Sequence, residues 1–163
     1  MKRKRFAKRL MAWTAALAML PGVVPASAQS EALGTIQLRL SIGTQTMSVR
    51  LEDSSASQSL LEQLPLTLTF EDYNQTEKIA YPPDALDVSS VPDGCDPEVG
   101  TLAYYKPWGN LCIFYREFRA STDLVPLGMI ESDMRVIQNM QGNFEIALEA
   151  LDEASSGDAV PDR

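Results

Sequence analysis

The chain has 163 residues, with 22 acidic and 14 basic side chains, no histidine and a formal net charge of −8. The lack of histidine excludes Ser-His-Asp and Cys-His nucleophile systems, and also zinc sites that contain histidine. The acidic balance disfavours nucleic acid and anionic membrane surfaces as partners, because both repel a negatively charged protein.

Residues 1–28 have the three parts of a secretory signal peptide. Lys and Arg side chains gather in residues 2–9, an apolar run spans 10–20, and Ala26-Ser27-Ala28 has the small-x-small form that signal peptidase reads. An uncleaved membrane anchor is the alternative, but the run is shorter than the roughly 20 residues that span a bilayer. We expect export through the Sec route, cleavage after Ala28, and a periplasmic or extracellular protein that is not attached to the membrane.

Cleavage changes the charge of the domain that remains, residues 29–163. All 22 acidic residues follow residue 28 and six of the 14 basic residues precede it, so eight positive and 22 negative charges leave a net charge of −14. The remaining length is typical of one domain with a core of its own. We assign residues 29–151 to that domain.

The first part of this domain alternates apolar and polar residues. Residues 36–42 and 47–51 follow a period of two, with a turn at Gly43-Thr44-Gln45 between them. Such alternation is typical of strands with one face on a core, so we predict a β-hairpin. A short helix is predicted next, because Asp53 or Ser54 can cap its N-terminus and Pro65 ends the apolar run of helical spacing.

A second pair of strands follows this helix. Residues 66–73 return to a period of two, with Glu71 and Tyr73 on the face opposite the apolar residues, and residues 78–81 form another strand that ends at Pro82-Pro83. Glu71 and Tyr73 are therefore expected to point away from the core.

Residues 84–100 form a long connection rich in Asp, Pro, Ser and Gly, which often marks a functional or covering segment. Its acidic residues lack the Asp-x-Asp-x-Asp-Gly spacing of a calcium loop, so we expect no metal there, and no motif indicates a cofactor. Cys95 and Cys112 leave two alternatives open. They form a disulfide in an oxidising compartment, or Cys112 is a small buried residue of a strand.

Residues 101–116 hold much of the aromatic content of the chain. Two apolar and aromatic runs flank Pro107-Trp108-Gly109-Asn110, and proline followed two residues later by glycine is typical of a turn. This segment is predicted to be a β-hairpin.

The C-terminal part supplies two more strands and a helix. Residues 124–130, with Pro126 and Gly128, resemble an edge or bulged strand, and residues 144–149 alternate strictly. Between them Ser132 is expected to cap a second helix, with Met134 and Ile137 facing inward. Residues 152–163 are acidic, small and proline-containing, and we predict a disordered tail.

Short strands in this number, with two short helices, predict a mainly β fold. A barrel that is closed or nearly closed has no exposed edges and leaves the helices to cover its ends. An open sandwich is the alternative, which periodicity does not separate from a barrel.

Five segments stand out along this domain, which are LPLTLTFEDYN (64–74), EKIAY (77–81), GTLAYY (100–105), PWGNL (107–111) and VPLG (125–128). In this order they resemble the bacterial cyclophilin-like domain family. The resemblance covers about residues 36–151 and implies an eight-stranded cyclophilin-like β-barrel with two short helices. It implies no established activity. Cyclophilins themselves line their proline-binding groove with an arginine, a histidine and aromatic and amide residues, and this chain has no histidine.

The candidate binding groove combines aromatic, amide and charged residues outside the barrel. Its members are Glu71, Tyr73 and Lys78 from one hairpin and Tyr105, Trp108, Asn110 and Phe114 from the other. Such a cluster binds a peptide or small molecule by stacking and a few directed hydrogen bonds. The alternative is that the aromatic residues cover the core while Glu71 and Lys78 pair across strands.

Three functions follow from this cluster. The first is a non-catalytic module that binds an unidentified peptide or small ligand. The second is a peptidyl-prolyl isomerase, in which Arg116 or Arg119 donates to the proline nitrogen as resonance is lost. The third is a purely structural exported domain. We predict the binding module, and no residue is assigned a catalytic role.

Overall fold

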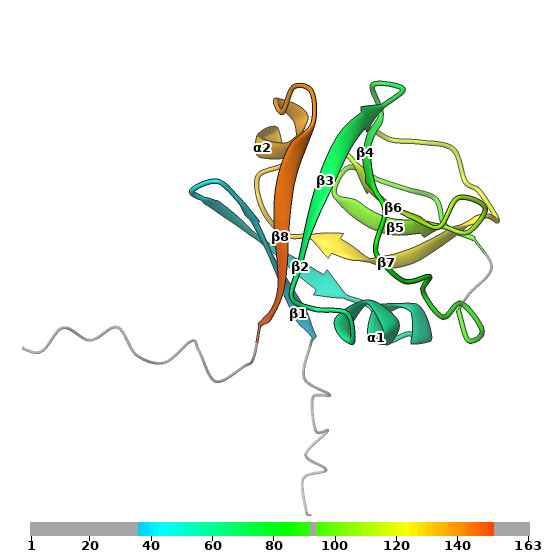
Figure 1. Cartoon of the computed structure of the whole chain (residues 1–163). Helices are drawn as coiled ribbons and strands as arrows, with labels where there is room; N and C mark the ends of the chain where they lie inside the picture. The colour runs from blue at the N-terminus through cyan, green and yellow to red at the C-terminus, as the bar shows by residue number, and fades with distance from the viewer. Residues whose placement is uncertain (1–35, 92–93, 152–163) are drawn as a thin grey trace, which may run out of the picture. The chain divides into compact units, whose positions relative to one another are not determined.

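The computed structural model describes residues 36–91 and 94–151, which form eight strands and two helices (Figure 1). The predicted signal peptide and the predicted tail lie outside the described residues. The elements are β1 (Gln37–Ile42), β2 (Gln45–Leu51), α1 (Ser55–Leu61), β3 (Leu66–Tyr73), β4 (Glu77–Ala80), β5 (Thr101–Tyr105), β6 (Asn110–Phe114), β7 (Leu124–Ile130), α2 (Arg135–Gln138) and β8 (Phe144–Leu151). No helix in residues 36–91 and 94–151 is long and apolar enough to cross a membrane.

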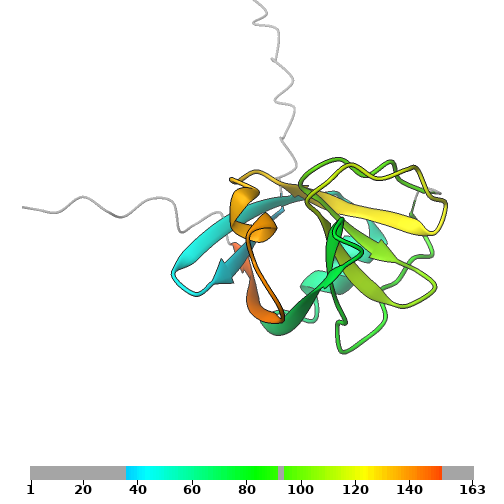
Figure 2. The ribbon, with the colours of Figure 1, turned by 90° about the horizontal axis from the view of Figure 1, so that it is seen from above.

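The strands close into a barrel in the order β1-β2-β7-β5-β6-β4-β3-β8, and β8 pairs with β1. Every pairing is antiparallel, and the view along the barrel shows the strands as a ring (Figure 2). Closure pairs both edges of each strand, which removes the exposed edges of an open sheet. The predicted closed barrel is confirmed, and the open sandwich is wrong.

Tight turns connect the hairpins at the predicted places. Gly43 has a φ of 58° between β1 and β2, and Asn74 and Gln75 have φ values of 51° and 54° between β3 and β4. Positive φ at both central residues matches the right-handed twist of the flanking strands. The predicted bulge lies in β7, because Leu102 of β5 pairs with Gly128 and Ala103 pairs with Pro126, which leaves Leu127 as the extra residue. This strand is not an edge, because it pairs with both β2 and β5.

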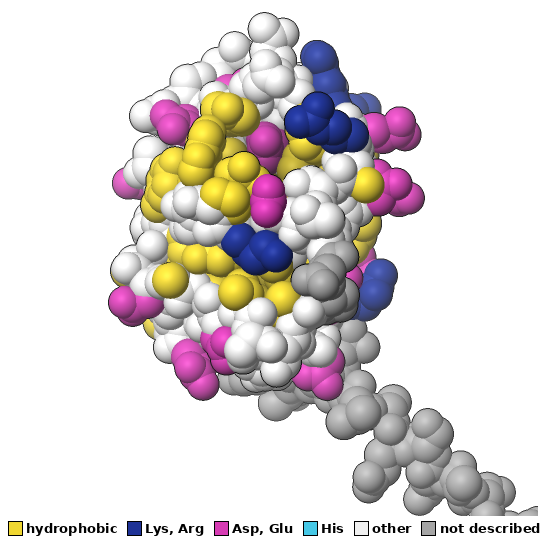
Figure 3. All heavy atoms as spheres, turned by 90° about the vertical axis from the view of Figure 1, so that its right-hand side faces the viewer, with side chains coloured by type: hydrophobic (Ala, Val, Ile, Leu, Met, Phe, Trp, Pro, Cys, Tyr) yellow, Lys and Arg dark blue, Asp and Glu magenta, His cyan; other side chains and the backbone are white. Residues whose placement is uncertain are grey.

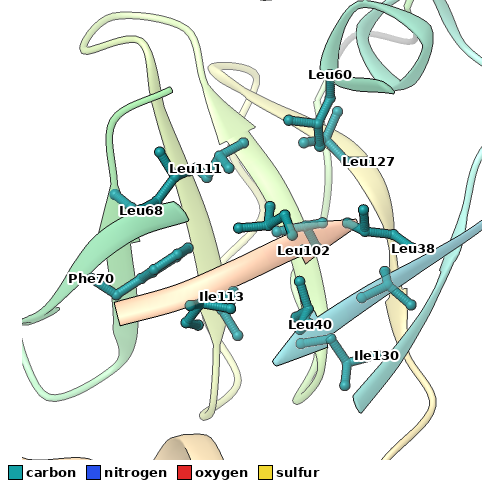
Figure 4. Packing of buried hydrophobic residues seen from close by; sticks show 14 of the residues in the cluster. Leu38, Leu40, Leu60, Leu68, Phe70, Leu102, Leu111, Ile113, Leu127 and Ile130 are labelled. Carbon is teal, nitrogen blue, oxygen red and sulfur yellow. The ribbon is translucent and has the colours of Figure 1, made fainter. Parts of the chain in front are cut away.

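The barrel interior is filled by the apolar members of the alternating strands. Leu38 and Leu40 of β1 are fully buried and face Leu102 of β5 and Ile113 of β6 in the same cluster (Figure 4). Helix α1 adds Leu60 from one end, and its N-terminus is capped by Ser54, whose side chain accepts from the backbone N–H of Ser57. This confirms one of the two predicted caps.

Helix α2 covers the other end of the barrel, with Ile137 fully buried and Met134 partly buried (Figure 1). Its predicted cap is wrong. The helix begins at Arg135, its N-cap position is Met134, and the Ser132 hydroxyl instead accepts a hydrogen bond from the backbone N–H of Ser48 at 3.1 Å. The side chain therefore ties the segment before α2 to strand β2.

A second, smaller apolar cluster lies on the outer face of the barrel wall. Every residue of β6 is buried, because Leu111 and Ile113 face the interior while Cys112 and Phe114 pack outside it. A strand buried on both faces has an uninterrupted apolar sequence rather than alternation. Loop segments around Cys95 and Phe118 cover this outer cluster.

These covering segments pair with each other. Cys95 and Ser121 exchange two backbone hydrogen bonds of 3.0 and 2.9 Å, and the N–H of Phe118 donates to Pro97. The long connection before β5 thus folds onto the connection after β6. Together they form a wall beside the outer face of β4, β5 and β6.

Candidate functional site

A pocket of about 260 Å³ opens on the outer face of the barrel, above the second apolar cluster. Its lining residues are Tyr73, Glu77, Ile79, Tyr105, Trp108, Asn110, Cys112, Phe114, Phe118, Arg119, Ser121, Asp123 and Leu124. Figure 3, which views the side of the barrel that carries β4 to β7, shows hydrophobic side chains gathered around recessed acidic ones, with basic side chains nearby. The site is apolar with a few charged groups, as small-molecule sites usually are.

Aromatic rings form the walls of this pocket. Trp108 meets Tyr73 and Tyr105 edge to face, with ring centroids 5.4 and 5.5 Å apart and interplanar angles of 89° and 83°. On another side Phe114 and Phe118 stack at 5.8 Å. Edge-to-face contacts fix the rings relative to one another, so the wall exists before any ligand enters. Trp108 and Tyr73 are nevertheless 49 % and 42 % exposed.

The turn between β5 and β6 places Trp108 at the rim. Gly109 adopts a φ of 69°, and its N–H donates to the carbonyl of Tyr105 at 2.9 Å, which closes the turn. The N–H of Lys106 donates to the carbonyl of Asp123 at 3.0 Å and ties the turn to the opposite loop. A left-handed conformation at this position favours glycine.

The floor of the pocket is polar. Asn110 is 1 % exposed, and its Nδ2 donates to the carbonyl of Leu111 and to Sγ of Cys112, each at 3.2 Å. A carbonyl oxygen only accepts hydrogen bonds, so the part of the amide that faces Leu111 is Nδ2, and this fixes the orientation of the side chain. Oδ1 is therefore on the other side, and within the described part of the chain it has no hydrogen-bond partner.

Glu77, the first residue of β4, supplies a second unpaired acceptor. Its Oε2 atom is buried and lacks a hydrogen-bond partner among residues 36–91 and 94–151. Burial raises the pKa of this carboxyl group, and the nearby Cys112 thiol opposes that effect only in part. The Cys112 thiol hydrogen-bonds to this carboxyl group, but the Oε2 atom keeps no partner among the described residues. Burial and the Glu77 charge in turn raise the pKa of Cys112.

Five of the seven residues predicted for the groove line this pocket. They are Tyr73, Tyr105, Trp108, Asn110 and Phe114. Glu71 is exposed on β3, opposite Ile79, and lies outside the lining. Lys78 is 1 % exposed and lies elsewhere, because successive residues of a strand face opposite sides and Glu77 takes the outward position.

Lys78 instead holds a buried network at one end of the barrel. Its Nζ donates to Asp72 Oδ2 at 2.7 Å and to the carbonyl of Met140 at 2.8 Å, and it lies 5.0 Å from the centroid of the Tyr115 ring. The strand register pairs Lys78 with Asp72, so the alternative in which Glu71 pairs with Lys78 is wrong. This network joins strands β3 and β4 to the segment after α2.

Burial and hydrogen bonds in this network shift the pKa values of Asp72 and Tyr115 in opposite directions. Burial raises the pKa of Asp72, but hydrogen bonds from Lys78, Tyr115 and the backbone of Gln75 outweigh it, so the net pKa is lowered. Burial and the hydrogen bond to Asp72 raise the pKa of Tyr115 to about 12. Asp72 therefore stays ionised opposite the lysine, which is the arrangement of a structural ion pair.

Several lining residues were not predicted from the sequence. Glu77 precedes the strand that we predicted from Lys78, and Phe118 and Asp123 lie in the connection after β6, for which we predicted no role. Arg119 was named only as a donor in the isomerase alternative. The signal for Glu77 was available. It stands two residues before Ile79, on the same face of a strand.

Both cysteines are free thiols in the part of the chain that the structure describes. Cys112 is buried, and Cys95 is partly exposed and packs against the cluster that contains Cys112. Their pairing on export stays a prediction. Among the described residues no group of three or more Cys, Asp and Glu side chains is placed to hold a metal ion.

Comparisons with known proteins agree with this architecture. The model of the Cyclophilin-like family matches residues 40–149, more than half of the chain. The solution structure of a hypothetical protein from Archaeoglobus fulgidus is similar in fold, with a TM-score of 0.58 and 17 % sequence identity over 71 % of this chain and 94 % of that one. A search among curated proteins found no match. The chain belongs to the cyclophilin-like family.

Proposed function

We propose that this protein is an exported cyclophilin-like domain whose outer pocket binds a peptide segment or small ligand without catalysing a reaction. One observation carries the proposal. Glu77 and Asn110 line an aromatic pocket, and one acceptor atom of each, Oε2 and Oδ1, is buried and lacks a hydrogen-bond partner in the described residues. Buried polar atoms in folded proteins are nearly always hydrogen-bonded, so these two indicate a missing donor.

The aromatic walls support the same conclusion. A structural cluster hides its large side chains, whereas Trp108 and Tyr73 remain about half exposed and enclose open space. Exposed apolar surface around a concave polar floor is typical of a recognition site. The purely structural alternative predicts a groove filled by the protein's own side chains.

Export is part of the proposal and rests on the signal-peptide pattern of residues 1–28. It places the domain in the periplasm or outside the cell. The net charge of −14 after cleavage disfavours nucleic acid and anionic membranes as partners there. Mass spectrometry of the exported protein tests this part, and an N-terminus at Gln29 is the expected result.

Trp108 provides the test of binding. It is one of two tryptophans, and the other, Trp13, lies in the predicted signal peptide. Titration with a mixed library of short peptides and small molecules is expected to change its fluorescence, because a ligand in the pocket alters the surroundings of the indole. The change must disappear in Trp108→Phe. A folded protein whose fluorescence responds to no member of the library contradicts the proposal.

One observation favours a second candidate, a peptidyl-prolyl isomerase. Arg119 lines the aromatic pocket, and catalysis of proline rotation needs an apolar pocket and a donor aimed at the proline nitrogen. Its guanidinium group lies over the Phe118 ring, 5.5 Å from the centroid. Faster cis to trans exchange of a proline tetrapeptide, lost in Arg119→Gln, supports this candidate, and exchange at the background rate excludes it.

A further inference from the structure

We infer that the group recognised by this pocket is a primary ammonium carried on an apolar stem. The inference rests on the proposed binding function and specifies its ligand. It follows from three properties of the pocket, which are the kind of polar atom left unpaired on its floor, the charge there, and the nature of its walls.

The unpaired atoms on the floor are both acceptors. Asn110 uses its Nδ2 on Leu111 and Cys112, which leaves Oδ1 for a ligand. Glu77 contributes Oε2. A carboxylate or phosphate ligand is therefore excluded from this floor, because it brings more acceptors and negative charge. A group with two or more N–H donors satisfies both atoms, and a primary ammonium has three.

The floor also carries an uncompensated negative charge. The four ion pairs within residues 36–91 and 94–151 involve other carboxylates, so Glu77 has no cationic partner there. Arg119 lines the same pocket, but its guanidinium group lies over the Phe118 ring. A partly buried carboxylate without a cationic partner is costly, and a ligand cation relieves that cost. A neutral amide ligand would donate hydrogen bonds but would not compensate the negative charge of Glu77.

The walls favour a cation with an apolar body. Tyr73, Tyr105 and Trp108 surround the opening, and aromatic faces attract an ammonium group that has lost part of its water. Phe114 and Phe118 provide apolar surface for the stem. The acidic mature domain increases the local concentration of cations, which assists the encounter. Two sources share this chemistry, a free amine and the side chain of lysine in a peptide.

Calorimetric titration of the full chain with two matched pairs of probes tests the inference. The first pair is 2-phenylethylamine and 2-phenylethanol, and the second is acetyl-Gly-Lys-Gly-amide and the same peptide with acetylated lysine. We expect each ammonium probe to bind about tenfold or more tightly than its neutral counterpart, as expected for a charge-assisted hydrogen bond. Whichever ammonium probe binds more tightly identifies the source.

Two variants test whether Glu77 is responsible for the binding of the ammonium probes. Glu77→Gln keeps the size of the side chain and is expected to lower the affinity for the ammonium probes about tenfold or more. Glu71→Gln makes the same change of charge at an exposed position outside the pocket and is expected to leave the affinity nearly unchanged. Circular dichroism checks that both variants are folded, and the comparison of charged and neutral probes needs no variant.

Neutral probes that bind at least as tightly as their ammonium counterparts overturn the inference but leave the binding function standing. Ammonium binding that is equal in Glu77→Gln and the parent protein also overturns it. Loss of ammonium binding in both Glu77→Gln and Glu71→Gln shows a general effect of surface charge, and this also contradicts the assignment. If the fluorescence titration with the mixed library also gives no response, then both this inference and the proposed binding function are wrong.

Discussion

Asn110 donates a hydrogen bond from Nδ2 to Sγ of Cys112 across 3.2 Å, and this contact holds the amide with its oxygen unpaired among the described residues. Both residues belong to β6, two positions apart, so they share the outward face of the strand. The strand that fills the barrel core on one side therefore also builds the polar floor of a pocket on the other.

Asn110→Leu is expected to preserve stability and remove ligand binding. The substitution loses two hydrogen bonds but also removes a buried acceptor without a partner in residues 36–91 and 94–151, so the free energy of unfolding should change by about 1 kcal/mol or less. The neighbouring Leu111→Ala, which leaves a cavity in the core, should cost about 2 to 5 kcal/mol. Urea unfolding measures both, and a loss of more than 3 kcal/mol in Asn110→Leu would show a structural anchor instead.

Glu77→Gln is expected to make the unliganded protein more stable at pH 7. Burial raises the pKa of Glu77 above its ordinary value of 4.5, so the folded state binds this proton more tightly than the unfolded state. Stability is therefore lost as the pH rises from the unfolded pKa through the folded one. Cys112, Arg119 and Asp123 line the same pocket and are present in both proteins.

The measurement is urea unfolding of the parent and of Glu77→Gln across this pH range. The advantage of the variant should disappear below about pH 4, where the carboxyl group is protonated in both states. Glu71→Gln serves as the charge-matched control at an exposed position. A Glu77→Gln protein less stable than the parent at pH 7 would refute the account of an unpaired buried carboxylate.

The ion pair between the buried Lys78 and the partly exposed Asp72 is expected to respond unequally to loss of each partner. Asp72→Ala leaves a lysine that is 1 % exposed without its carboxylate, which should cost about 3 to 5 kcal/mol. Lys78→Met removes the buried charge itself and should cost less. Guanidinium unfolding of the two variants gives the comparison, and equal losses would mean that desolvation of Lys78 contributes little.

The two thiols are expected to react at different rates. Burial raises the pKa of both thiols, but Cys112 is buried and also faces the charge of Glu77, whereas Cys95 is partly exposed. Iodoacetamide should therefore alkylate Cys95 first in the reduced folded protein and reach Cys112 only on unfolding. Faster labelling of Cys112 would contradict its burial. Labelling without reductant shows whether the exported protein pairs the two.

The barrel could be predicted from the sequence because most strands have one face on the core and therefore alternate apolar and polar residues. Residues 36–42, 66–73 and 144–149 alternate strictly, and each forms a strand at about the expected place. The two-faced burial of β6 has its own signature, an uninterrupted run from Leu111 to Phe114.

The site was predictable only in part, because it depends on register and on a loop. Tyr73, Tyr105 and Trp108 were found as aromatic residues near turns. Lys78 was predicted to line the groove, but Glu77 lines it instead. The predicted strand began one residue late, and such a shift reverses which side chain faces outward. The contribution of Arg119 depends on backbone pairing between the segments around Cys95 and Ser121, which no periodicity in the sequence indicates.

A crystal structure of the protein with 2-phenylethylamine tests the central claim most directly. The pocket beside Trp108 should hold the ammonium nitrogen within about 3 Å of Glu77 Oε2 and Asn110 Oδ1, with the phenyl ring against the aromatic wall. The same pocket occupied by the Arg119 side chain, or holding only water at a saturating concentration of the amine, would contradict it.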